Sequence, residues 1–419
     1  MSVFIFRNKE YRIKNGSLVL DRKNIKSFKE LQDLGNFNDI TALHLWHNEI
    51  NDFNNIVAIP NLEILDLYEN KVSNMGGVDK LHNLKILKLK HNDLTEIINL
   101  ENLKKLEVLE LNNNRVSEIK GLEKLVNLKI LGLGGNLIKK VKGLDNLTSL
   151  KILKLNNNHI NKIEEIKGLT NLKELNLSNN KIVEIHSLDN LKNLKVLILS
   201  NNKIIRIDGL QTLTKLEKLA LDRNQIKKIE GLDNLTNLRE LKLNNNQIAE
   251  IEGLEYLQNL EELVLDYNHI QELKKDLELK NLKRLDLYNN EISEIKGFSK
   301  LENLLRLHLQ SNNISEIKGL NNLKKLQSLG LGRNKISEIK NLDGLSNLIG
   351  LDLSDNQISE LKNLEHLENL GTIGIYGNLL PKELYNQLRE DYDDGYDAWK
   401  CVEYCRERIS NKDPIEKNY

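Results

Sequence analysis

The stretch Leu65-Asp66-Leu67-Tyr68-Glu69-Asn70 carries the phrase L-x-L-x-x-N, and this phrase decides the fold. It returns every 22 residues without a slip, and an asparagine closes each copy. A fixed period of this length is the signature of a solenoid, in which one short unit is stacked on the next. The closing asparagines are Asn48, Asn70, Asn92, Asn114, Asn136, Asn158, Asn180, Asn202, Asn224, Asn246, Asn268, Asn290, Asn312, Asn334, Asn356 and Asn378.

Apolar residues hold fixed positions around each asparagine, at −8, −5, −3, +2, +5, +8, +11 and +14 counted from it. Positions −5 and −3 are two residues apart, so both side chains point to one face of a short strand. The other apolar positions advance in steps of three, which favours a tight turn or a short 3₁₀ stretch over a long α-helix. Each unit, or coil, is therefore predicted to be a strand, a turn and a short helical return.

The asparagines are predicted to form a buried ladder. At the bend after the strand, backbone amides and carbonyls have no sheet partner, and an unpaired buried group costs about 1–3 kcal/mol. An asparagine side chain offers two donors and an acceptor, so a stacked column can satisfy its own coil and the next one.

Position +7 of most coils is a glycine or an asparagine, which is typical of a turn. This position holds, for example, Gly77, Gly121 and Gly253, which suits a corner with positive φ. One coil breaks the pattern, because Asp276 occupies +8 where the other coils have an apolar residue. Either Leu277 replaces it in the core, or the stack bulges at residues 274–280.

Length and charge exclude several classes of protein. A chain of 419 residues would ordinarily suggest two or three domains, but the unbroken register predicts one solenoid. Lys+Arg and Asp+Glu both total 61, so the formal net charge is zero, which argues against non-specific electrostatic binding to nucleic acid or anionic lipid. Glutamates at +4 and lysines at +6 are predicted to form solvated columns of opposite sign.

Both ends of a solenoid expose apolar faces that must be covered for solubility. Residues 1–41 are predicted to form an N-terminal cap, with a hairpin turn at Asn15-Gly16 and a degenerate first repeat. Residues 42–378 form the repeats, and residues 379–419 form a helical C-terminal cap. Cys401 and Cys405 are predicted to be reduced thiols on a packed helix.

The phrase N-x-I-x-x-I-x-G-L, seen in residues 246–254, resembles the 22-residue class of leucine-rich repeat. The regulatory subunit of protein phosphatase 1 and bacterial internalins share that class, and the resemblance covers residues 43–378. It implies an α/β solenoid shaped as a horseshoe, with a concave parallel β-sheet and a convex side of short 3₁₀ turns. It also implies a binding function, because members differ mainly in the partner held on the concave face.

Positions −6, −4 and −2 point onto the open face of the sheet, with −1 at its rim. Two groups there are candidates for binding a partner, because aromatic residues are enriched at binding hot spots. The first group is His44, Trp46, His47, Asp66, Tyr68 and Glu69; the second is Asp222, Arg223, Asp266, Tyr267, His269, Asp286, Tyr288, Arg306 and His308. The alternatives are that Trp46 packs under the N-terminal cap and that the second group is a solvated surface.

No cofactor, metal or catalytic site is predicted. The sheet is bare at Gly132, Gly134 and Gly135, but this segment lacks the second half of a phosphate-loop signature. The first residues carry no secretion signal, and no apolar run is long enough to span a membrane. We expect a cytoplasmic scaffold that binds a protein and neither nucleic acid nor membrane; the alternative is an internalin-type surface adhesin whose leader is missing.

Overall fold

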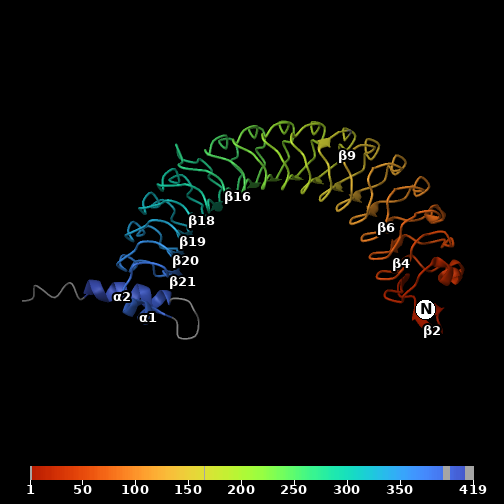
Figure 1. Ribbon diagram of the computed structural model, residues 1–419, viewed down its shortest axis with the longest axis horizontal. Coiled ribbons are helices and arrows are strands. Elements are labelled where there is room, and N and C mark those ends of the chain that lie inside the picture. Colours follow the sequence, from red (N-terminus) through yellow and green to blue (C-terminus); the bar gives the residue numbers. More distant parts are fainter. Residues whose placement is uncertain (1, 165, 390–396, 411–419) are drawn as a thin grey trace, which may run out of the picture. The chain divides into compact units, whose positions relative to one another are not determined.

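The computed structural model describes residues 2–164, 166–389 and 397–410. The chain divides into two compact units. Figure 1 labels the strands and helices along the chain. The first unit extends through Ile204 and includes Asp208–Leu216, and the second takes Ile205–Ile207 and the chain from Glu217 onward.

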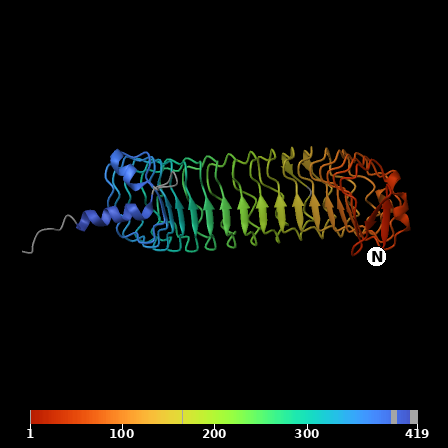
Figure 2. The same ribbon diagram turned by 90° about the horizontal axis from the view of Figure 1, so that it is seen from below.

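The first unit is a parallel-sheet solenoid. Its strands pair with their sequence neighbours in parallel, and from β4 onward partners are one 22-residue period apart, as in Leu65 with Leu87. These strands are β3 (Ser17–Val19), β4 (Ala42–His44), β5 (Ile64–Asp66), β6 (Ile86–Lys88), β7 (Val108–Glu110), β8 (Ile130–Gly132), β10 (Ile152–Lys154), β12 (Glu174–Asn176) and β13 (Val196–Ile198). Figure 2 shows them side by side.

The second unit repeats the arrangement with the same register, as in Leu285 with Leu307. Its strands are β14 (Lys218–Ala220), β15 (Glu240–Lys242), β16 (Glu262–Val264), β17 (Arg284–Asp286), β18 (Arg306–His308), β19 (Ser328–Gly330), β20 (Gly350–Asp352) and β21 (Thr372–Gly374). The predicted fold class, a parallel-sheet solenoid of 22-residue coils, is confirmed in both units.

Each strand has one buried face and one open face. In β6 the central Leu87 is fully buried, while Ile86 and Lys88 on either side of it are half-buried. The apolar side chains of successive coils thus form the core on one side of the sheet, and positions −6, −4 and −2 lie on the other side, as predicted.

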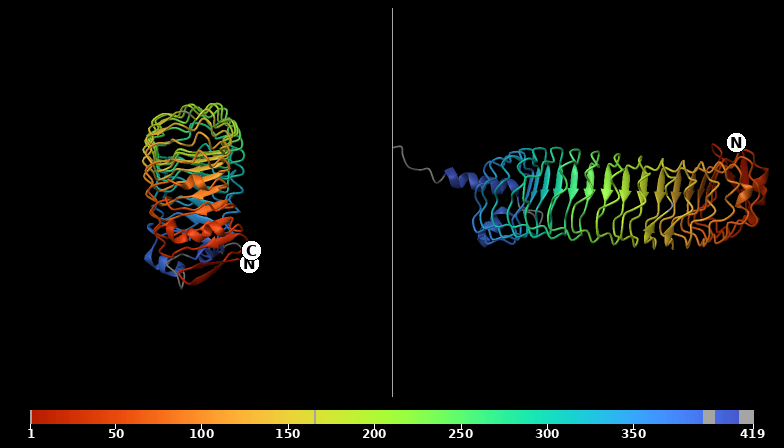
Figure 3. Two further views of the ribbon diagram at one scale, coloured as in Figure 1. Left: turned by 90° about the vertical axis from the view of Figure 1, so that its right-hand side faces the viewer. Right: turned by 90° about the horizontal axis from the view of Figure 1, so that it is seen from above.

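The returns are mostly tandem turns and not helices. In the coil after Asn246, the N–H of Leu257 donates to the carbonyl of Leu254, and Leu260 donates to Leu257. Among the described returns, η1 (Phe28–Asn36), between β3 and β4, and η2 (Val78–Lys80) are 3₁₀-helices, and two returns are extended at β9 (Lys140–Val141) and β11 (Lys162–Ile163). Figure 3 shows the returns running alongside the strands within each unit.

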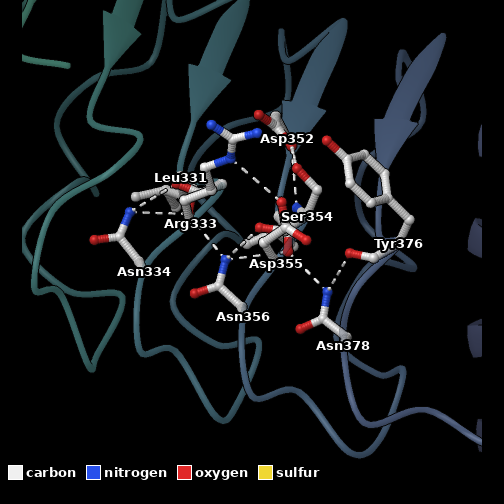
Figure 4. A network of polar contacts seen from close by, with 11 residues as sticks. Leu331, Arg333, Asn334, Asp352, Ser354, Asp355, Asn356, Tyr376 and Asn378 are labelled. Atoms are coloured by element: carbon white, nitrogen blue, oxygen red, sulfur yellow. Dashed lines mark hydrogen bonds and ion pairs between the residues drawn. The ribbon is translucent and has the colours of Figure 1, made fainter. Parts of the chain in front are cut away.

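The asparagine ladder is present, and it joins each coil to the one before it (Figure 4). Asn334 Nδ2 donates to the carbonyl of Leu331 in its own coil and to that of Leu309 in the preceding coil, both at 3.0 Å. Its Oδ1 accepts from the N–H of Ile314, also in the preceding coil. The expected partner was the next coil, so the direction of the ladder is corrected.

Positive φ recurs at two positions of the coil. The glycines at +7, such as Gly121 and Gly253, have positive φ as predicted, with values of 74° and 69°. Position −1 is also left-handed, for example at Asn157 and Asn245, and this corner was not predicted. The signal was available, because asparagine and glycine, which tolerate positive φ best, recur at −1.

In the irregular coil Leu277 replaces Asp276 in the core, which is the first of the two predicted alternatives. Leu277 is 6% exposed. The Asp276 carboxylate lies outside and accepts hydrogen bonds from the backbone N–H and hydroxyl of Ser299.

Short elements flank the repeats. The N-terminal β1 (Val3–Phe6) and β2 (Lys9–Arg12) form an antiparallel hairpin, and η1 (Phe28–Asn36) follows β3. The turn at Asn15-Gly16 is present, closed by an isolated bridge between Lys14 and Ser17. At the other end lie α1 (Lys382–Leu388) and α2 (Ala398–Ser410). We propose that residues 1–41 and 379–419 act as caps.

Replacing one ladder asparagine tests the main stabilising contact. Asn202→Ala removes donors to Leu177 and Leu199 and the acceptor for the N–H of Ile182. We expect chemical denaturation to show a loss of about 1–3 kcal/mol in the free energy of unfolding. Asn171→Ala is the matched control, because that amide is exposed and donates one bond, to Thr148. Equal stability of the wild type and Asn202→Ala would refute the ladder.

Candidate functional site

A stripe of aliphatic residues crosses the open face of the first unit at position −6. Cross-strand pairing places these side chains in a row, and all are half-buried although they face away from the core. They are Ile64, Ile86, Val108, Ile130 and Ile152. The prediction missed this stripe; counting residue types at −6 would have found it.

An aromatic row borders the same face near its rim. His47 lies between Trp46 and Tyr68, with ring centroids 6.2 and 5.5 Å away, and Tyr68 meets His91 edge to face at 5.4 Å. Trp46 remains 38% exposed. The predicted group is thus brought together and is longer than predicted, because His91 extends it; His91 shares position −1 with His47.

Charged side chains lie between the stripe and the aromatic row, at position −4. Asp66 lies 3.5 Å from the ammonium group of Lys88, and it also accepts from the backbone N–H of Tyr68. His44 is half-buried on β4 beside Asp66 in the register. At the rim, Glu69 lies 2.7 Å from His47 Nδ1. The open face of the first unit therefore has apolar, charged and aromatic bands.

The second group centres on a buried carboxylate, Asp286, whose side chain is 3% exposed. Arg284 holds it with Nε at 2.8 Å and Nη2 at 2.7 Å, and His308 Nδ1 lies 2.8 Å from its other oxygen. Burial raises the pKa of Asp286, but His308 and Arg284 outweigh this effect, so the pKa lies below its usual value. Asp286 is therefore an ionised anchor for its two neighbours.

Asp266 lies near Asp286, and its pKa is shifted in the opposite direction. Burial, and then the nearby charge of Asp286, raises the pKa of Asp266 to about 6. Its Oδ1 accepts from the backbone N–H of Tyr288 at 2.9 Å.

Two tyrosines stand next to Asp266. The ring of Tyr267 meets that of Tyr288 edge to face, with centroids 5.2 Å apart. Tyr267 is 45% exposed and has φ of 53°, a left-handed backbone that costs a non-glycine residue about 1–2 kcal/mol. A bulky ring held at a strained, exposed position gains little for the fold, which favours a binding role.

Several predicted residues stand apart from this group. Asp222 and Arg223 follow β14, two coils before Asp266, and Asp222 lies near Lys242. His269 pairs with Glu291 at 3.1 Å, and Arg306 is exposed next to Arg284 in the register. Arg284, which the prediction did not name, holds Asp286; its signal is an arginine at −6 two residues before an aspartate at −4.

The sheet near Gly132 and Gly134 is not bare. A Cβ on Gly132 would lie 2.5 Å from Asn112 Nδ2, and one on Gly134 would lie 2.7 Å from Asn156 Oδ1, so these amides fill the space. Gln310 covers Gly330 in the same way.

Cys401 and Cys405 are free and buried on α2. Burial raises the pKa of the Cys401 thiol to about 12 and that of Cys405 to about 11. Thiols with such pKa values stay protonated and unreactive at neutral pH.

Over the described residues, no group of three or more histidine, cysteine, aspartate or glutamate side chains is placed to hold a metal ion. None of the described helices is long and apolar enough to cross a membrane.

Models of known families match most of the repeats. A model described as leucine-rich repeats in two copies matches residues 104–147, 126–169, 148–192, 192–234, 214–256, 236–279 and 302–344. A second leucine-rich-repeat model matches residues 258–314. No curated protein matches the chain significantly.

Solved structures of bacterial proteins are similar. An internalin of Listeria monocytogenes is 32% identical with a TM-score of 0.61, and the match covers 70% of this chain and 88% of that protein. A leucine-rich-repeat protein of Leptospira interrogans is 26% identical with a TM-score of 0.66, over 96% and 100% of the two chains. YopM of Yersinia enterocolitica, at 21% identity, covers 82% of this chain and 80% of its own, with a TM-score of 0.61; it shows a likeness of fold alone.

Asp266→Asn tests the electrostatics of the second group. The folded state holds this proton up to about pH 6, whereas the ordinary carboxyl pKa is 3.8, so the stability that it contributes falls as the pH rises through that window. Asparagine keeps the acceptor for Tyr288 without the buried charge. We expect the melting temperature of the variant, relative to the wild type, to increase between pH 4 and pH 7.5. A difference that is the same at both pH values would contradict the assignment.

Proposed function

The chain belongs to the leucine-rich-repeat family, and on that premise we propose that it is a protein-binding scaffold whose open sheet face holds a folded protein partner. The repeats and their similarity to an internalin support a role in protein interaction. We further propose that the main contact with the partner lies on the first unit, across strands β4 to β10.

One observation carries this proposal: the aliphatic stripe lies half-exposed on the face that the core does not need. Positions −5 and −3 supply the core contacts of each strand region, so a serine, lysine or glutamate at −6 would serve the fold equally well, as Glu240 and Ser328 do elsewhere. Five β-branched residues in consecutive strands are better explained by an apolar surface that a partner covers.

The dimensions limit how the partner sits. The stripe crosses five strands, or about 19 Å, and lies about 13 Å along the strand from the aromatic row. That rectangle of about 250 Å² is roughly a third of the 800 Å² that one side of a standard interface buries. A partner must therefore reach past these bands, onto the rim or onto further coils.

Trp46 and Tyr68 are the proposed anchors. Trp46 is 38% exposed and contacts His47, and Tyr68 is half-buried between His47 and His91, so little rotamer freedom is lost on binding. Aromatic side chains of this kind, surrounded by polar groups, are typical of the residues that dominate binding energy. The group around Asp266, Tyr267 and Tyr288 is proposed as a separate contact surface within the second unit.

Cytoplasmic localisation is part of the proposal. Its competitor is a surface adhesin, which the similarity to an internalin favours. Protease treatment of intact source cells separates the two, with detection by an antibody raised against the repeats. We expect the protein to be protected until the cells are lysed; digestion in intact cells would decide for the adhesin.

Tyr68→Ala tests the anchor. The wild-type protein, immobilised, captures partners from source-cell lysate, and the affinity of the purified partner is then measured by calorimetry. Loss of a central aromatic typically costs 2 kcal/mol or more, so we expect about thirtyfold weaker binding with the melting temperature almost unchanged.

The matched control for that experiment is Tyr256→Ala. Tyr256 is a tyrosine that is 59% exposed and lies on a return, away from the open sheet face. It should change neither binding nor melting temperature. A large fall in the melting temperature of Tyr68→Ala with binding intact would show that the aromatic row serves folding.

A further inference from the structure

The irregular coil after Asn268 leaves a hollow in the side of the second unit, and its cause is the residue at +7. In regular coils this corner presses against the coil before it: a Cβ on Gly253 would lie 2.5 Å from the carbonyl oxygen of Ile229. Where asparagine replaces glycine, as at Asn341, the side-chain amide donates to that carbonyl, here Ile317, at 2.7 Å. Both residue types have positive φ at this corner.

Lys275 meets neither condition. It has no positive φ, and its side chain cannot fit against the carbonyl of Ile251 in the way that glycine or asparagine fits. This coil forms its hydrogen bonds with the following coil instead. The N–H of Leu277 donates to the carbonyl of Gly297, and the Asp276 carboxylate accepts from Ser299. A gap opens on the side of the preceding coil.

The backbone of this coil also has a spare donor. In the neighbouring coils the N–H of Leu257 and that of Leu301 each donate to the carbonyl at +8. The corresponding N–H of Leu279 donates to no acceptor within the described residues, although Leu279 is buried and lines the gap. An orphan donor of this kind is rare in a folded interior, and here it marks the coil whose backbone departs from the regular path.

The gap is a hollow of about 300 Å³. Ile251, Leu254, Leu277 and Leu279 supply its apolar wall. For comparison, an engineered apolar cavity of about 150 Å³ binds benzene, so this space accepts up to two fused rings. An apolar space with few polar groups is the usual form of a small-molecule site.

The rim of the hollow is acidic. Glu252, Glu255, Asp276 and Glu278 outnumber Lys275 and Lys300, and Lys275 is already paired with Glu255. A second, more polar hollow of about 440 Å³ adjoins the first and shares Glu278 and Lys300 with it. A positive charge on the ligand would therefore be favoured over a negative one at the mouth.

We infer that the hollow between residues 251–255 and 275–279 binds a small aromatic amine: a flat ring system of one or two rings in the apolar space, with its ammonium group at the rim carboxylates. This site lies on the returns, away from the open sheet face, and it is independent of the protein-binding role.

Tryptamine is the probe, because it combines two fused rings with an ammonium group. Ligand-detected NMR and calorimetry on the full chain should show one site with a Kd on the order of 1 mM, the value that a ligand of this size gains from a good apolar pocket. Indole-3-propionate, with the same rings and the opposite charge, should bind at least fivefold more weakly. Equal binding of both probes, or of neither, would overturn the inference.

A repaired coil removes the site without damaging the fold. The triple variant Lys275→Gly, Asp276→Leu and Leu277→Asp copies the regular sequence Gly231-Leu232-Asp233. It should melt no lower than the wild type and should no longer bind tryptamine. A folded triple variant that binds tryptamine with unchanged affinity would contradict the site.

The charge at the rim gives a second test that does not require refolding the coil. Glu278→Lys leaves three acids and three lysines at the rim, so tryptamine should bind more weakly, indole-3-propionate more tightly, and the preference for tryptamine should disappear. Glu101→Lys, an exposed acid on a regular return of the first unit, is the control and should change neither. An unchanged order of the two probes in Glu278→Lys would also refute the inference.

Discussion

Every coil depends on one buried asparagine that satisfies backbone groups of two coils at once. At Asn334 a single side-chain amide contacts three carbonyls, those of Leu309, Leu331 and Gly332, and accepts from one backbone N–H. The bend after each strand is thereby completed from inside the core, so the fold needs nothing from the side chains at −6, −4 and −2. Those positions are free to carry function, and the aliphatic and aromatic bands of the first unit occupy them.

The same constraint explains where the molecule departs from regularity. The bend that the ladder closes requires positive φ at −1, where asparagine and glycine fit without strain. His47 and Tyr267 accept a less favourable backbone at that position and place a ring at the rim of the sheet. On the return, the corner at +7 has a similar requirement, and Lys275 fails it. His47, Tyr267 and Lys275 lie at surfaces for which binding is proposed, whereas Asp355 is left-handed at −1 outside them.

Much of this architecture was predictable because a strict period leaves few choices. The period predicted the strand at each L-x-L, the buried ladder and the glycine corners. It did not show which coil each asparagine binds, since that depends on the path of the backbone. It could not decide between Leu277 and a bulge, because both satisfy the pattern, and the answer depends on the reach of Asp276 to Ser299. The aliphatic stripe escaped notice because the open-face positions were searched for aromatic and charged residues and not for aliphatic ones. The cluster of Arg284, Asp286 and His308 depends on side-chain conformations that spacing does not determine.

The central claim is that the open sheet face of the first unit holds a protein partner, and position-specific photo-crosslinking tests it most directly. Benzoylphenylalanine would replace Tyr68 on the open face in one protein and Val183, exposed on a return, in another. Both proteins would be expressed in the source cells, irradiated and examined by mass spectrometry. We expect position 68 to crosslink to one defined protein and position 183 to give no crosslink to that protein. Crosslinking of that protein from position 183 alone would contradict it.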